Sequence, residues 1–467
     1  MNPFLNPFTG FPFLRDFLTD PARLRRLSQR KLDEYRNKAF RKAVVYAWNV
    51  PVYREKYRNQ GITPDMIFEV EDIQRLPFIT KKELLDNFPD NVVPLGYDKR
   101  KAQMICTSGS SGKILTFYSD FLTISKAVTI SIRELQAYGL HWNTSRIAHI
   151  INFNPYQVNE AINQGFVSHA RTFSLLQNHL QLNPFQPIPE LMKQLDDFKP
   201  DAIVSYPVTF QHLAYLKMKG NGTHVKPRIL FVGGYVLDPY IRDYVEQAFG
   251  CKMVNVYGSA ESGGDISFEC LKGTWHINHD FYHIESVNKD LEAVEPGKKG
   301  RIIVTRLFGR GTPMIRYTGM DDLITLEPVH ECECGLCTPS IKGVEGRIDS
   351  TIVLPDGRMY PSASFSIMST ILNDLKTNKV RQFQIVQKQL NEIEISLVFD
   401  DEQRNTAPSV DRIIETVEAA YVKMVGPLVK IIVKEKKEIT SEEGKPSPFV
   451  VSYVPRDKIQ EMLDQLD

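Results

Sequence analysis

Between about residue 145 and residue 258, short apolar segments alternate with longer amphipathic ones. The apolar runs IAHIINF, DAIVSYP, RILFVGG and CKMVNVYG are each bounded by turn-forming residues. The stretches between them include LDPYIRDYVEQAFG, which closes on Gly250, a good helix stop. Strand, helix and strand in this order are typical of βαβ units, so we predict an α/β fold with mainly parallel sheets. Such folds bind ligands in the loops beyond the carboxyl ends of their strands. In this sequence those loops contain Gly233, Gly234 and residues 257–264.

The pattern differs on both sides of this region. Residues 21–60 predict helices with many basic positions, and Pro64, Pro77 and Pro89 then separate short helical segments. After residue 350 the runs QFQIVQ and IEISLVF alternate like strands, and an amphipathic helix follows that ends at Gly426. We therefore expect a large N-terminal domain, residues 1–348, and a small C-terminal α+β domain, residues 349–467.

Composition and charge narrow the class of protein. The 467 residues are 42% hydrophobic and 24% charged, and the formal net charge is +1. This balance gives no electrostatic reason to expect nucleic acid or an anionic membrane as a partner. The segment Met1–Phe17 is interrupted by Arg15 and Asp16, so a signal peptide is not expected, and no run approaches a membrane span. We expect a soluble, cytoplasmic protein that handles a small molecule.

The stretch TSGSSGK alternates small hydroxyl residues with glycines, a composition that lets backbone N–H groups and hydroxyls surround phosphate oxygens. It is not a Walker A loop, because two residues rather than four separate its glycines and Ile114 follows the lysine. A flexible Ser/Gly turn is the alternative. The candidate phosphate-binding residues are Thr107, Ser108, Gly109, Ser110, Ser111, Gly112 and Lys113.

Four further stretches carry candidate chemistry. YGSAE places Tyr257, an aromatic suited to stacking on a base, before Gly258, Ser259 and Glu261, whose carboxylate is a ligand type that Mg²⁺ prefers. A strand-end turn with a solvated Glu261 is the alternative. PMIRYTGMDD offers a carboxylate for ribose hydroxyls, unless it is a solvated acidic turn. The stretch GRIDS contains Arg347, whose planar guanidinium suits contact with phosphate or ribose, and Asp349. The stretch EEGKPS contains Lys445 in a polar loop.

The order of these motifs resembles that of the adenylate-forming superfamily, which covers acyl-CoA synthetases, luciferases and peptide-synthetase adenylation domains. Residues 44–89, LFVGG, GTWHINHDFYHIE and EPGKKGRIIVTRLF are similar to segments of phenylacetate–CoA ligases and their capsule-cluster relatives. The resemblance covers residues 40–454. It implies a carboxylic acid activated by ATP as an acyl-adenylate and then transferred to a thiol, which we expect to be CoA.

The resemblance also implies roles for individual residues. ATP would lie between the domains under the TSGSSGK loop, with Gly233, Gly234 and Tyr257 near adenine. Glu261 would hold Mg²⁺, and Asp321 would hold the ribose, although the spacing leaves Asp322 open. Arg347 would contact phosphate or ribose, Asp349 would be the hinge of a mobile C-terminal domain, and Lys445 would bridge the substrate carboxylate and the α-phosphate. The absence of a basic residue after Lys445 and the presence of Tyr235 depart from the pattern.

Four of the six cysteines lie between residues 270 and 337, which favours a metal site over unrelated thiols. Members of the subgroup that the chain resembles often hold zinc through Cys-x5-His and Cys-x-Cys. Here the matching residues are Cys270, His276, Cys332 and Cys334, a closed tetrahedral set without an open position. Cys337 could replace Cys332 or Cys334.

Several alternatives stay open at this point. The acceptor could be a carrier protein, or AMP could be transferred to a deazaflavin coenzyme. A non-catalytic homologue that binds nucleotide or zinc is a third possibility. The resemblance is also compatible with a homodimer. The acid itself is not specified, although Asn152, Asn154 and Tyr156 suggest one more polar than phenylacetate.

Overall fold

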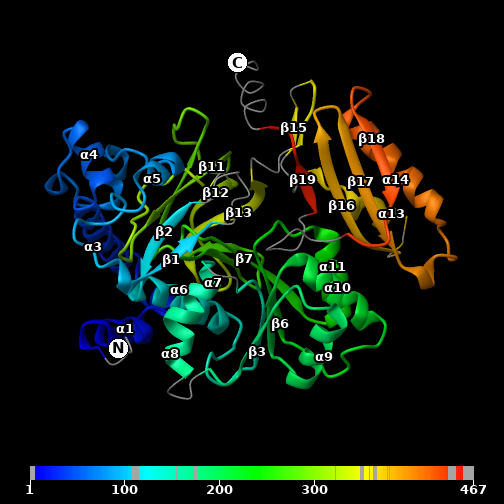
Figure 1. Cartoon of the computed structure of the whole chain (residues 1–467), viewed down its shortest axis with the longest axis horizontal. Helices are drawn as coiled ribbons and strands as arrows, with labels where there is room; N and C mark the ends of the chain where they lie inside the picture. The colour runs from blue at the N-terminus through cyan, green and yellow to red at the C-terminus, as the bar shows by residue number, and fades with distance from the viewer. Residues whose placement is uncertain are drawn as a thin grey trace. The chain divides into compact units, whose positions relative to one another are not determined.

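The structure is a computed structural model (Figure 1). It describes residues 6–107, 115–153, 156–171, 176–320, 322–347, 352–356, 358–360, 365–375, 377, 379–439 and 449–455. The chain folds into two compact units. The first comprises Met1–Ile147, Ile151–Gln181 and Val254–Gly343, and the second comprises Ala148–Ile150, Leu182–Met253 and Val344–Asp467. The two units are defined by contacts, whereas the expected boundary between residues 348 and 349 marks where a mobile C-terminal domain would begin. That boundary stays a prediction.

The first unit begins with helices, as the N-terminal pattern predicts. They are α1 (Pro7–Thr19), α2 (Arg23–Arg26), α3 (Gln29–Ala47), α4 (Pro51–Asn59), α5 (Lys81–Asn87), α6 (Phe121–Ala137), α7 (Val158–Ile162) and α8 (Ser168–Arg171). α5 shows why a helix starts where it does. The Thr80 hydroxyl accepts a bond from the Glu83 N–H and the Glu83 carboxylate accepts one from the Thr80 N–H, so two end donors are satisfied.

The strands of the first unit form an antiparallel hairpin and a larger sheet. The hairpin pairs β1 (Ala102–Cys106) with β2 (Thr116–Asp120). The larger sheet has the order β10-β11-β12-β13-β9-β8-β7, and the registered pairs within it are antiparallel. Its strands are β7 (Lys252–Ser259), β8 (Gly264–Glu269), β9 (Trp275–Ile277), β10 (Tyr282–Val287), β11 (Lys299–Arg306), β12 (Asp322–Glu331) and β13 (Cys337–Arg347).

The second unit contains the predicted βαβ arrangement. β5 (Ala202–Ser205) leads through α10 (Pro207–Met218) to β6 (Ile229–Val232), and the two strands pair in parallel. β6 is buried at every position, as expected for a strand covered on both faces. The expected α/β class is thereby confirmed, although parallel pairing is found here and not in the registered pairs of the first unit's sheet. Elements that lie wholly or partly in this unit are also β3 (Ile147–Ile150), β4 (His179–Leu182), α9 (Ile188–Phe198) and α11 (Pro239–Phe249).

The C-terminal part of the second unit is the predicted α+β assembly. Its elements are β14 (Ile352–Val353), β15 (Met359–Tyr360), α13 (Met368–Asp374), β16 (Val380–Gln389), β17 (Glu392–Phe399), α14 (Val410–Val425), β18 (Lys430–Glu435) and β19 (Val450–Ser452). The sheet has the order β18-β17-β16-β19, in which β16 and β17 are antiparallel and the outer pairs are parallel. The hydroxyl of Tyr421, fully buried on α14, accepts a 3.2 Å bond from the Ile367 N–H, which ties α14 to the start of α13.

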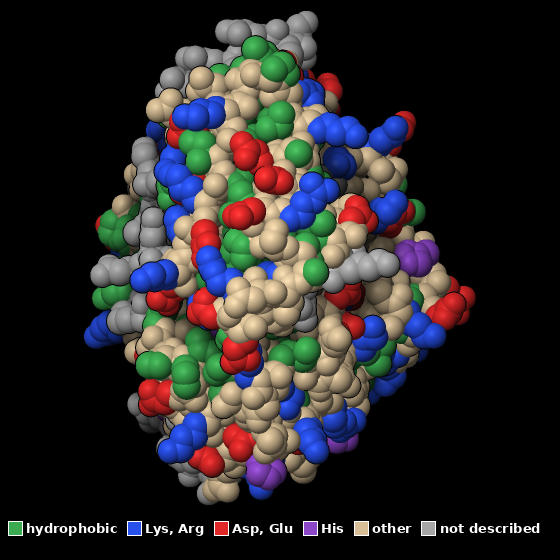
Figure 2. All heavy atoms as spheres, turned by 90° about the vertical axis from the view of Figure 1, so that its right-hand side faces the viewer, with side chains coloured by type: hydrophobic (Ala, Val, Ile, Leu, Met, Phe, Trp, Pro, Cys, Tyr) green, Lys and Arg blue, Asp and Glu red, His purple; other side chains and the backbone are tan. Residues whose placement is uncertain are grey.

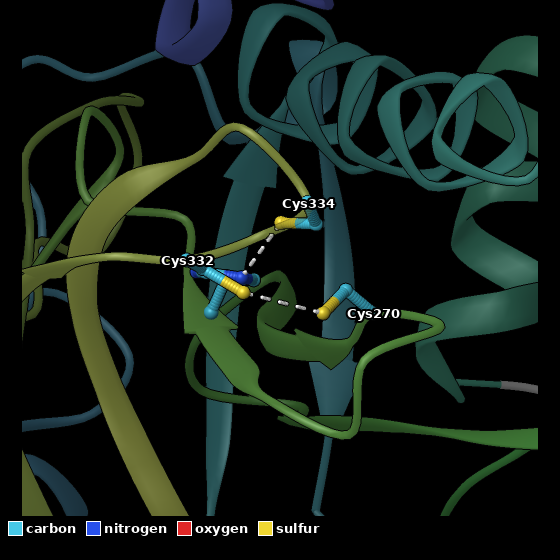
Figure 3. A group of neighbouring side chains, drawn as sticks. Cys270, Cys332 and Cys334 are labelled. Atoms are coloured by element: carbon cyan, nitrogen blue, oxygen red, sulfur yellow. Dashed lines mark hydrogen bonds between the residues drawn. The ribbon is translucent and has the colours of Figure 1, made fainter.

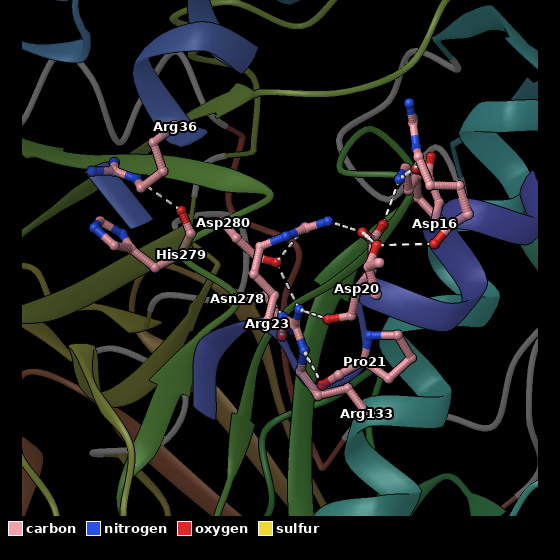
Figure 4. A network of polar contacts seen from close by, with 12 residues as sticks. Asp16, Asp20, Pro21, Arg23, Arg36, Arg133, Asn278, His279 and Asp280 are labelled. Atoms are coloured by element: carbon pink, nitrogen blue, oxygen red, sulfur yellow. Dashed lines mark hydrogen bonds and ion pairs between the residues drawn. The ribbon is translucent and has the colours of Figure 1, made fainter. Parts of the chain in front are cut away.

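A buried ion-pair network joins the start of the chain to the sheet of the first unit (Figure 4). Asp280, 1% exposed, lies 2.8 Å from Nη1 of Arg23 and 2.7 Å from Nη2 of Arg133. Arg133, on α6, also donates to the Asp20 carbonyl at 2.6 Å and to Oδ1 of Asn278 at 2.8 Å. Because each charge has opposite partners and further hydrogen bonds, the cost of burying it is offset.

On the face shown in Figure 2, Lys and Arg side chains are interspersed with Asp and Glu. This mixture agrees with the net charge of +1. Among the described residues, no helix has both the length and the apolar character needed to cross a membrane.

Candidate active site and metal centre

The hairpin of β7 and β8 carries the predicted YGSAE motif. Buried Met253 and Val254 hold the start of β7 in the core, and the strand then emerges toward the turn at residues 260–263. The turn is fixed by local hydrogen bonds, because the Ser259 N–H donates to the Ser262 hydroxyl at 2.8 Å. The Ser262 N–H in turn donates to the Ser259 hydroxyl at 3.1 Å. The residues of the motif are therefore presented by a rigid turn.

Gly258 is required by the close approach of the two strands. A Cβ atom at this position would lie 2.7 Å from the Gly264 carbonyl oxygen and 2.9 Å from Cα of Asp265. Both atoms belong to the backbone, so no side-chain rotation could relieve the contact. The register of the hairpin also shifts between Tyr257 and Gly258. The glycine thus allows the bulge that aims the motif.

Glu261 lies at the turn and is 8% exposed. Its Oε1 accepts a 3.3 Å bond from the hydroxyl of Tyr317, which is fully buried, and its carbonyl accepts a 3.4 Å bond from Nη1 of Arg306. The alternative of a solvated glutamate in a turn is thus not supported. The carboxylate is held in place, with coordination capacity beyond the one observed bond, so its chemistry fits a hard cation such as Mg²⁺.

Tyr257 and Asp322 are joined by a 2.8 Å hydrogen bond from the tyrosine hydroxyl to Oδ2. Asp322 is the first residue of β12 and is 6% exposed, so the strand start fixes the orientation of the tyrosine. Sequence reasoning did not anticipate this bond. Of the two candidate ribose ligands, Asp322 therefore lies beside the predicted adenine residue, whereas Asp321 lies outside the described residues. A role for either in ribose binding stays a prediction.

Thr107 forms the base of the predicted phosphate loop. Its N–H donates to the Leu115 carbonyl at 2.9 Å, and its hydroxyl accepts from the Leu115 N–H at 3.0 Å. These two bonds close the β1–β2 hairpin around the residues between them. Those residues, Ser108, Gly109, Ser110, Ser111, Gly112 and Lys113, lie outside the described part of the chain.

Gly233 and Gly234 follow β6 in the second unit, where the βαβ pattern places a ligand loop. Gly234 has φ +83°, and a Cβ there would lie 3.1 Å from two ring atoms of Tyr206. The ring of Tyr206 in turn meets that of Tyr235 edge-on, with centroids 6.2 Å apart. Tyr235, which departs from the motif pattern of the family that the chain resembles, is therefore accommodated by packing against Tyr206. Contact of these glycines with adenine stays a prediction.

The remaining predicted catalytic residues fall at or beyond the edges of the described segments. Asp349 and Lys445 lie outside the described residues. Arg347 is the last residue of β13, but its side chain is outside the described part of the structure. Their assigned roles stay predictions.

The four predicted metal ligands do come together, and Figure 3 labels the three cysteines among them. The ligand atoms of Cys270, His276, Cys332 and Cys334 all lie within 4.8 Å of one another. Sγ of Cys270 is 3.9 Å from Sγ of Cys332, and Sγ of Cys334 is 3.1 Å from Nε2 of His276. Cys337 is exposed and is not part of this group.

Two similar turns bring these four side chains together. The Gly273 N–H donates to the Cys270 carbonyl, and the Gly335 N–H donates to the Cys332 carbonyl, each at 2.8 Å. The turns come from segments 62 residues apart that the sheet aligns. Nδ1 of His276 lies 2.9 Å from the Thr338 hydroxyl, which leaves Nε2 directed at the sulfurs.

Burial affects the two kinds of candidate ligand differently, because it raises the pKa of the Cys334 thiol to about 12, so that this thiol would have to lose its proton to bind a metal. Burial lowers the pKa of His276 to about 4, so its imidazole is neutral at pH 7, the form that binds metal. Three thiolates and one imidazole form a donor set that fits tetrahedral Zn²⁺ without an open position. Cys334 packs against a cluster of buried apolar residues, Leu24, Leu32, Phe268 and Leu336.

Arg316, of the Arg-Tyr motif, has a structural role. It is 5% exposed, and its Nε and Nη2 lie 3.1 Å and 2.6 Å from the carboxylate of Glu285. Its Nη1 donates to the Leu76 carbonyl at 2.7 Å, and the guanidinium covers the ring of Phe78 at 3.8 Å. The arginine therefore fastens the N-terminal segment to the sheet. The next residue, Tyr317, then faces Glu261.

The chain was compared with protein-family models and with known proteins. No family model matches the chain. A phenylacetate–coenzyme A ligase of Thermus thermophilus is 25% identical over 358 residues, which cover 74% of this chain and 77% of that protein. The phenylacetate–coenzyme A ligase of Escherichia coli K12 is 26% identical over 324 residues, or 67% of this chain and 70% of that protein. The chain is thus similar in sequence to phenylacetate–coenzyme A ligases over two thirds or more of its length.

The chain is also similar to a further curated protein and to solved structures. The CapK protein of Staphylococcus aureus is 23% identical over 408 residues, which cover 84% of this chain and 83% of CapK. Among solved structures, 2-hydroxyisobutyryl-CoA ligase with its acyl-AMP superposes with TM-score 0.75 at 19% identity, covering 95% of this chain and 94% of the other. The structure of an anthranilate–CoA ligase with anthranoyl-AMP superposes with TM-score 0.54 at 12% identity. The match covers 80% of this chain and 68% of the other. The ligase-like chain therefore has the fold of the adenylate-forming CoA ligases.

Proposed function

We propose that this chain is an AMP-forming acid–CoA ligase. It activates a carboxylic acid with ATP as an acyl-adenylate and transfers the acyl group to the thiol of CoA. The observation that carries the proposal is the alignment with phenylacetate–coenzyme A ligases over two thirds or more of the chain. The assembly of Tyr257, Glu261 and Asp322 around one hairpin, in a chain with this fold, supports it.

In the first half-reaction a carboxylate oxygen of the acid attacks the α-phosphorus of ATP, and the bond from that phosphorus to the pyrophosphate breaks. Lys445 would bridge the carboxylate and the α-phosphate, so that its charge offsets the charge that develops on the phosphoryl oxygens. The loop based on Thr107 would hold the β- and γ-phosphates through backbone N–H groups. Tyr257, oriented by Asp322, would contact the adenine.

In the second half-reaction the sulfur of CoA attacks the acyl carbon, the bond to AMP breaks, and the thiol proton is released to solvent. The C-terminal domain, residues 349–467, would rotate about Asp349 between the two steps. That motion would withdraw Lys445 and open a path for CoA.

Two metals belong to the proposal. Mg²⁺, which neutralises phosphate charge, would be held by Glu261, since this buried carboxylate has one hydrogen bond from Tyr317 and further lone pairs. Zn²⁺ would be held by Cys270, His276, Cys332 and Cys334 as a structural ion. It would tie the loop after β8 to the loop before β13.

The experiment compares the two half-reactions in the wild type and in Lys445→Ala. Acid-dependent exchange of pyrophosphate into ATP should fall by at least about 100-fold in the variant, because the charge that stabilises the transition state is lost. Thioester formation from chemically prepared acyl-adenylate and CoA should change by less than about threefold. Lys437→Ala, an exposed lysine of the same domain, is the matched control. Equal loss in both half-reactions, or in neither, would refute the assignment of Lys445.

A further inference from the structure

Helix α6 carries a glutamate on the face that packs against the β7–β8 hairpin. Glu134 is 4% exposed. It follows Ala127 by seven residues and Ile130 by four, so the three side chains share one stripe of the helix. A Cβ atom on Gly264 of β8 would lie 3.3 Å from Cα of Ala127 and 3.1 Å from Cδ1 of Ile130. The stripe therefore meets β8 closely, and a buried carboxyl group on it needs a hydrogen-bond partner.

The partner of Glu134 is a second carboxyl group. Its side chain is hydrogen-bonded to that of Asp265, the second residue of β8. The side chain of Asn278 also bonds Glu134, and its Nδ2 donates to the Asp265 carbonyl at 2.9 Å. Oε1 of Glu134 has no hydrogen-bond partner among the described residues. A hydrogen bond can join two carboxyl groups only when one of them keeps its proton.

The cation next to Glu134 is paired elsewhere. Arg133 precedes it on α6, and the guanidinium pairs with Asp280 at 2.7 Å (Figure 4). Within the described part of the chain, the ion pairs include none that involves Glu134. The other titratable groups near the pair are Tyr138, just after α6, and Tyr282 of β10, and burial raises the pKa of both phenols. No positive charge is therefore paired with Glu134, which disfavours its ionised form.

Burial and the second carboxyl group both favour a protonated Glu134. Burial first, and then the charge of Asp265, raise the pKa of Glu134 well above its ordinary value, although Arg133 acts in the opposite direction. Burial also raises the pKa of Asp265 to about 6, and the hydrogen bond from Glu134 opposes that rise. At pH 7 the pair keeps one proton, with Glu134 as the donor and the Asp265 carboxylate as the acceptor.

Asp265 lies at the base of the turn that presents Glu261. It pairs with Gly258 across the β7–β8 hairpin, and a Cβ atom on Gly258 would lie 2.9 Å from Oδ1 of Asp265. The Tyr282 hydroxyl donates to the Ser262 carbonyl at 3.2 Å, so β10 supports the turn as well. A displaced Asp265 side chain would therefore move the backbone of the YGSAE motif.

We propose that Glu134 and Asp265 share one proton at neutral pH, and that their hydrogen bond holds the turn that presents Glu261 in place. Both are positioning residues, since they act through the hairpin and not on the substrate. The positioning role rests on the proposed function, whereas the shared proton is a property of the folded chain alone. If both groups were ionised, two carboxylates would face each other between α6 and β8 and repel.

Glu134→Gln tests the shared proton without an assay of activity. The amide keeps the shape of the side chain and an N–H donor for Asp265, and it does not ionise. In the wild type, Glu134 keeps a proton that the unfolded chain loses above about pH 4.3, so its contribution to stability is lost as the pH rises toward the folded-state pKa. The melting temperature of the variant relative to wild type should therefore rise by at least about 2 °C between pH 5 and pH 7. Glu55→Gln, at an exposed glutamate of α4, is the matched control and should show no such rise.

The infrared difference spectrum of wild type minus Glu134→Gln at pH 7 gives a second readout. The wild type should show the C=O stretching band of a protonated carboxyl group, and the variant should lack it. The control spectrum of wild type minus Glu55→Gln should show no such band, because an exposed glutamate is ionised at pH 7.

Acid-dependent exchange of pyrophosphate into ATP tests the positioning role. Asp265→Ala removes the acceptor and should lower the exchange rate by at least about tenfold, because the turn is no longer held. Asp265→Asn keeps an acceptor oxygen for Glu134 and should restore the rate to within about threefold of wild type. Glu134→Gln, which keeps the donor, should stay within the same range. Far-UV circular dichroism identifies any variant that does not fold.

Three results would overturn the proposal. A melting temperature of Glu134→Gln that does not rise relative to wild type from pH 5 to 7, or the absence of the carboxyl band, would show that Glu134 is ionised. Exchange by folded Asp265→Ala within threefold of wild type would refute the positioning role. If the wild type shows no exchange with any acid, the proposed function fails, and the melting and infrared measurements still decide whether the proton is shared.

Discussion

Replacing Asp280 by asparagine tests the energetic reasoning about the buried network. The substitution keeps the size of the side chain and removes one negative charge between Arg23 and Arg133. These guanidinium groups lie 2.8 Å and 2.7 Å from the carboxylate, and all three side chains are less than 9% exposed. Arg23 keeps Asp20 as a partner, whereas Arg133 keeps only neutral acceptors among its described contacts. The substitution therefore leaves mainly the charge of Arg133 without an ion-pair partner among its described contacts.

Breaking a buried ion pair by removing one partner costs about 3–5 kcal/mol, because the remaining charge is left uncompensated. Asparagine can still accept one hydrogen bond, so we expect a loss of about 3 kcal/mol for Asp280→Asn. With roughly 2–4 °C per kcal/mol for domains of this size, the melting temperature should fall by about 10 °C.

The pH dependence of this loss has a definite sign. Burial alone would raise the pKa of Asp280, but the charges of Arg133 and Arg23 outweigh it and hold the pKa below its ordinary value. A lowered carboxyl pKa contributes stability that is complete above the unfolded-state value of about 3.9 and is lost as the pH falls through the folded-state value. The difference between wild type and variant should thus be constant from pH 5 to 8 and should shrink below about pH 4.

Differential scanning calorimetry at pH 5, 6, 7 and 8 measures the effect, with Asp290→Asn, an exposed aspartate, as control. The double variant Asp280→Asn/Arg133→Met should recover at least about 1 kcal/mol, since it removes the uncompensated charge. A decrease of less than about 3 °C at pH 7 for Asp280→Asn, or a double variant as unstable as the sum of its parts, would refute the reasoning.

Three further predictions concern the hairpin and the metal centre. Gly258→Ala should lower kcat/KM by roughly 100-fold, because its Cβ meets the β8 backbone and displaces the motif; a loss below threefold would contradict the geometry. Tyr257→Phe, which removes the donor to Asp322, should raise KM for ATP by about tenfold in steady-state kinetics, and an unchanged KM would contradict it. Purified wild type should contain about one zinc per chain by plasma mass spectrometry. Cys332→Ser should lose it and Cys337→Ser should keep it, and the reverse order would refute the ligand set.

The parts of the fold that follow from local patterns could be predicted. The alternation of apolar runs and amphipathic stretches indicated β5, β6 and α11, because a buried strand is a continuous apolar run and α11 has one apolar face. Glycine caps such as Gly250, with φ +67°, ended helices where expected. The family resemblance named Cys270, His276, Cys332 and Cys334, and the structure brings these four side chains together, whereas their binding of zinc stays a prediction.

Long-range pairings could not be predicted, because nothing local distinguishes the partner. Arg133 and Lys126 lie on a helix whose sequence is ordinary, yet they meet Asp280 and Asp16, which are 147 and 110 residues away. The same holds for the bond between Tyr257 and Asp322, which are 65 residues apart. The antiparallel order of the first sheet likewise depends on distant strand pairs rather than on the period of each strand.

The most direct test of the proposed activity is pyrophosphate release from ATP and Mg²⁺ across a panel of aryl, acyl and hydroxy acids, with and without CoA. We predict that release depends on a particular acid and that sustained AMP formation also requires CoA, with a CoA thioester as product. Pyrophosphate release with a stable adenylylated product and no effect of CoA would contradict the acceptor. ATP binding without release for any acid of the panel would contradict the central claim that this chain is an acid–CoA ligase.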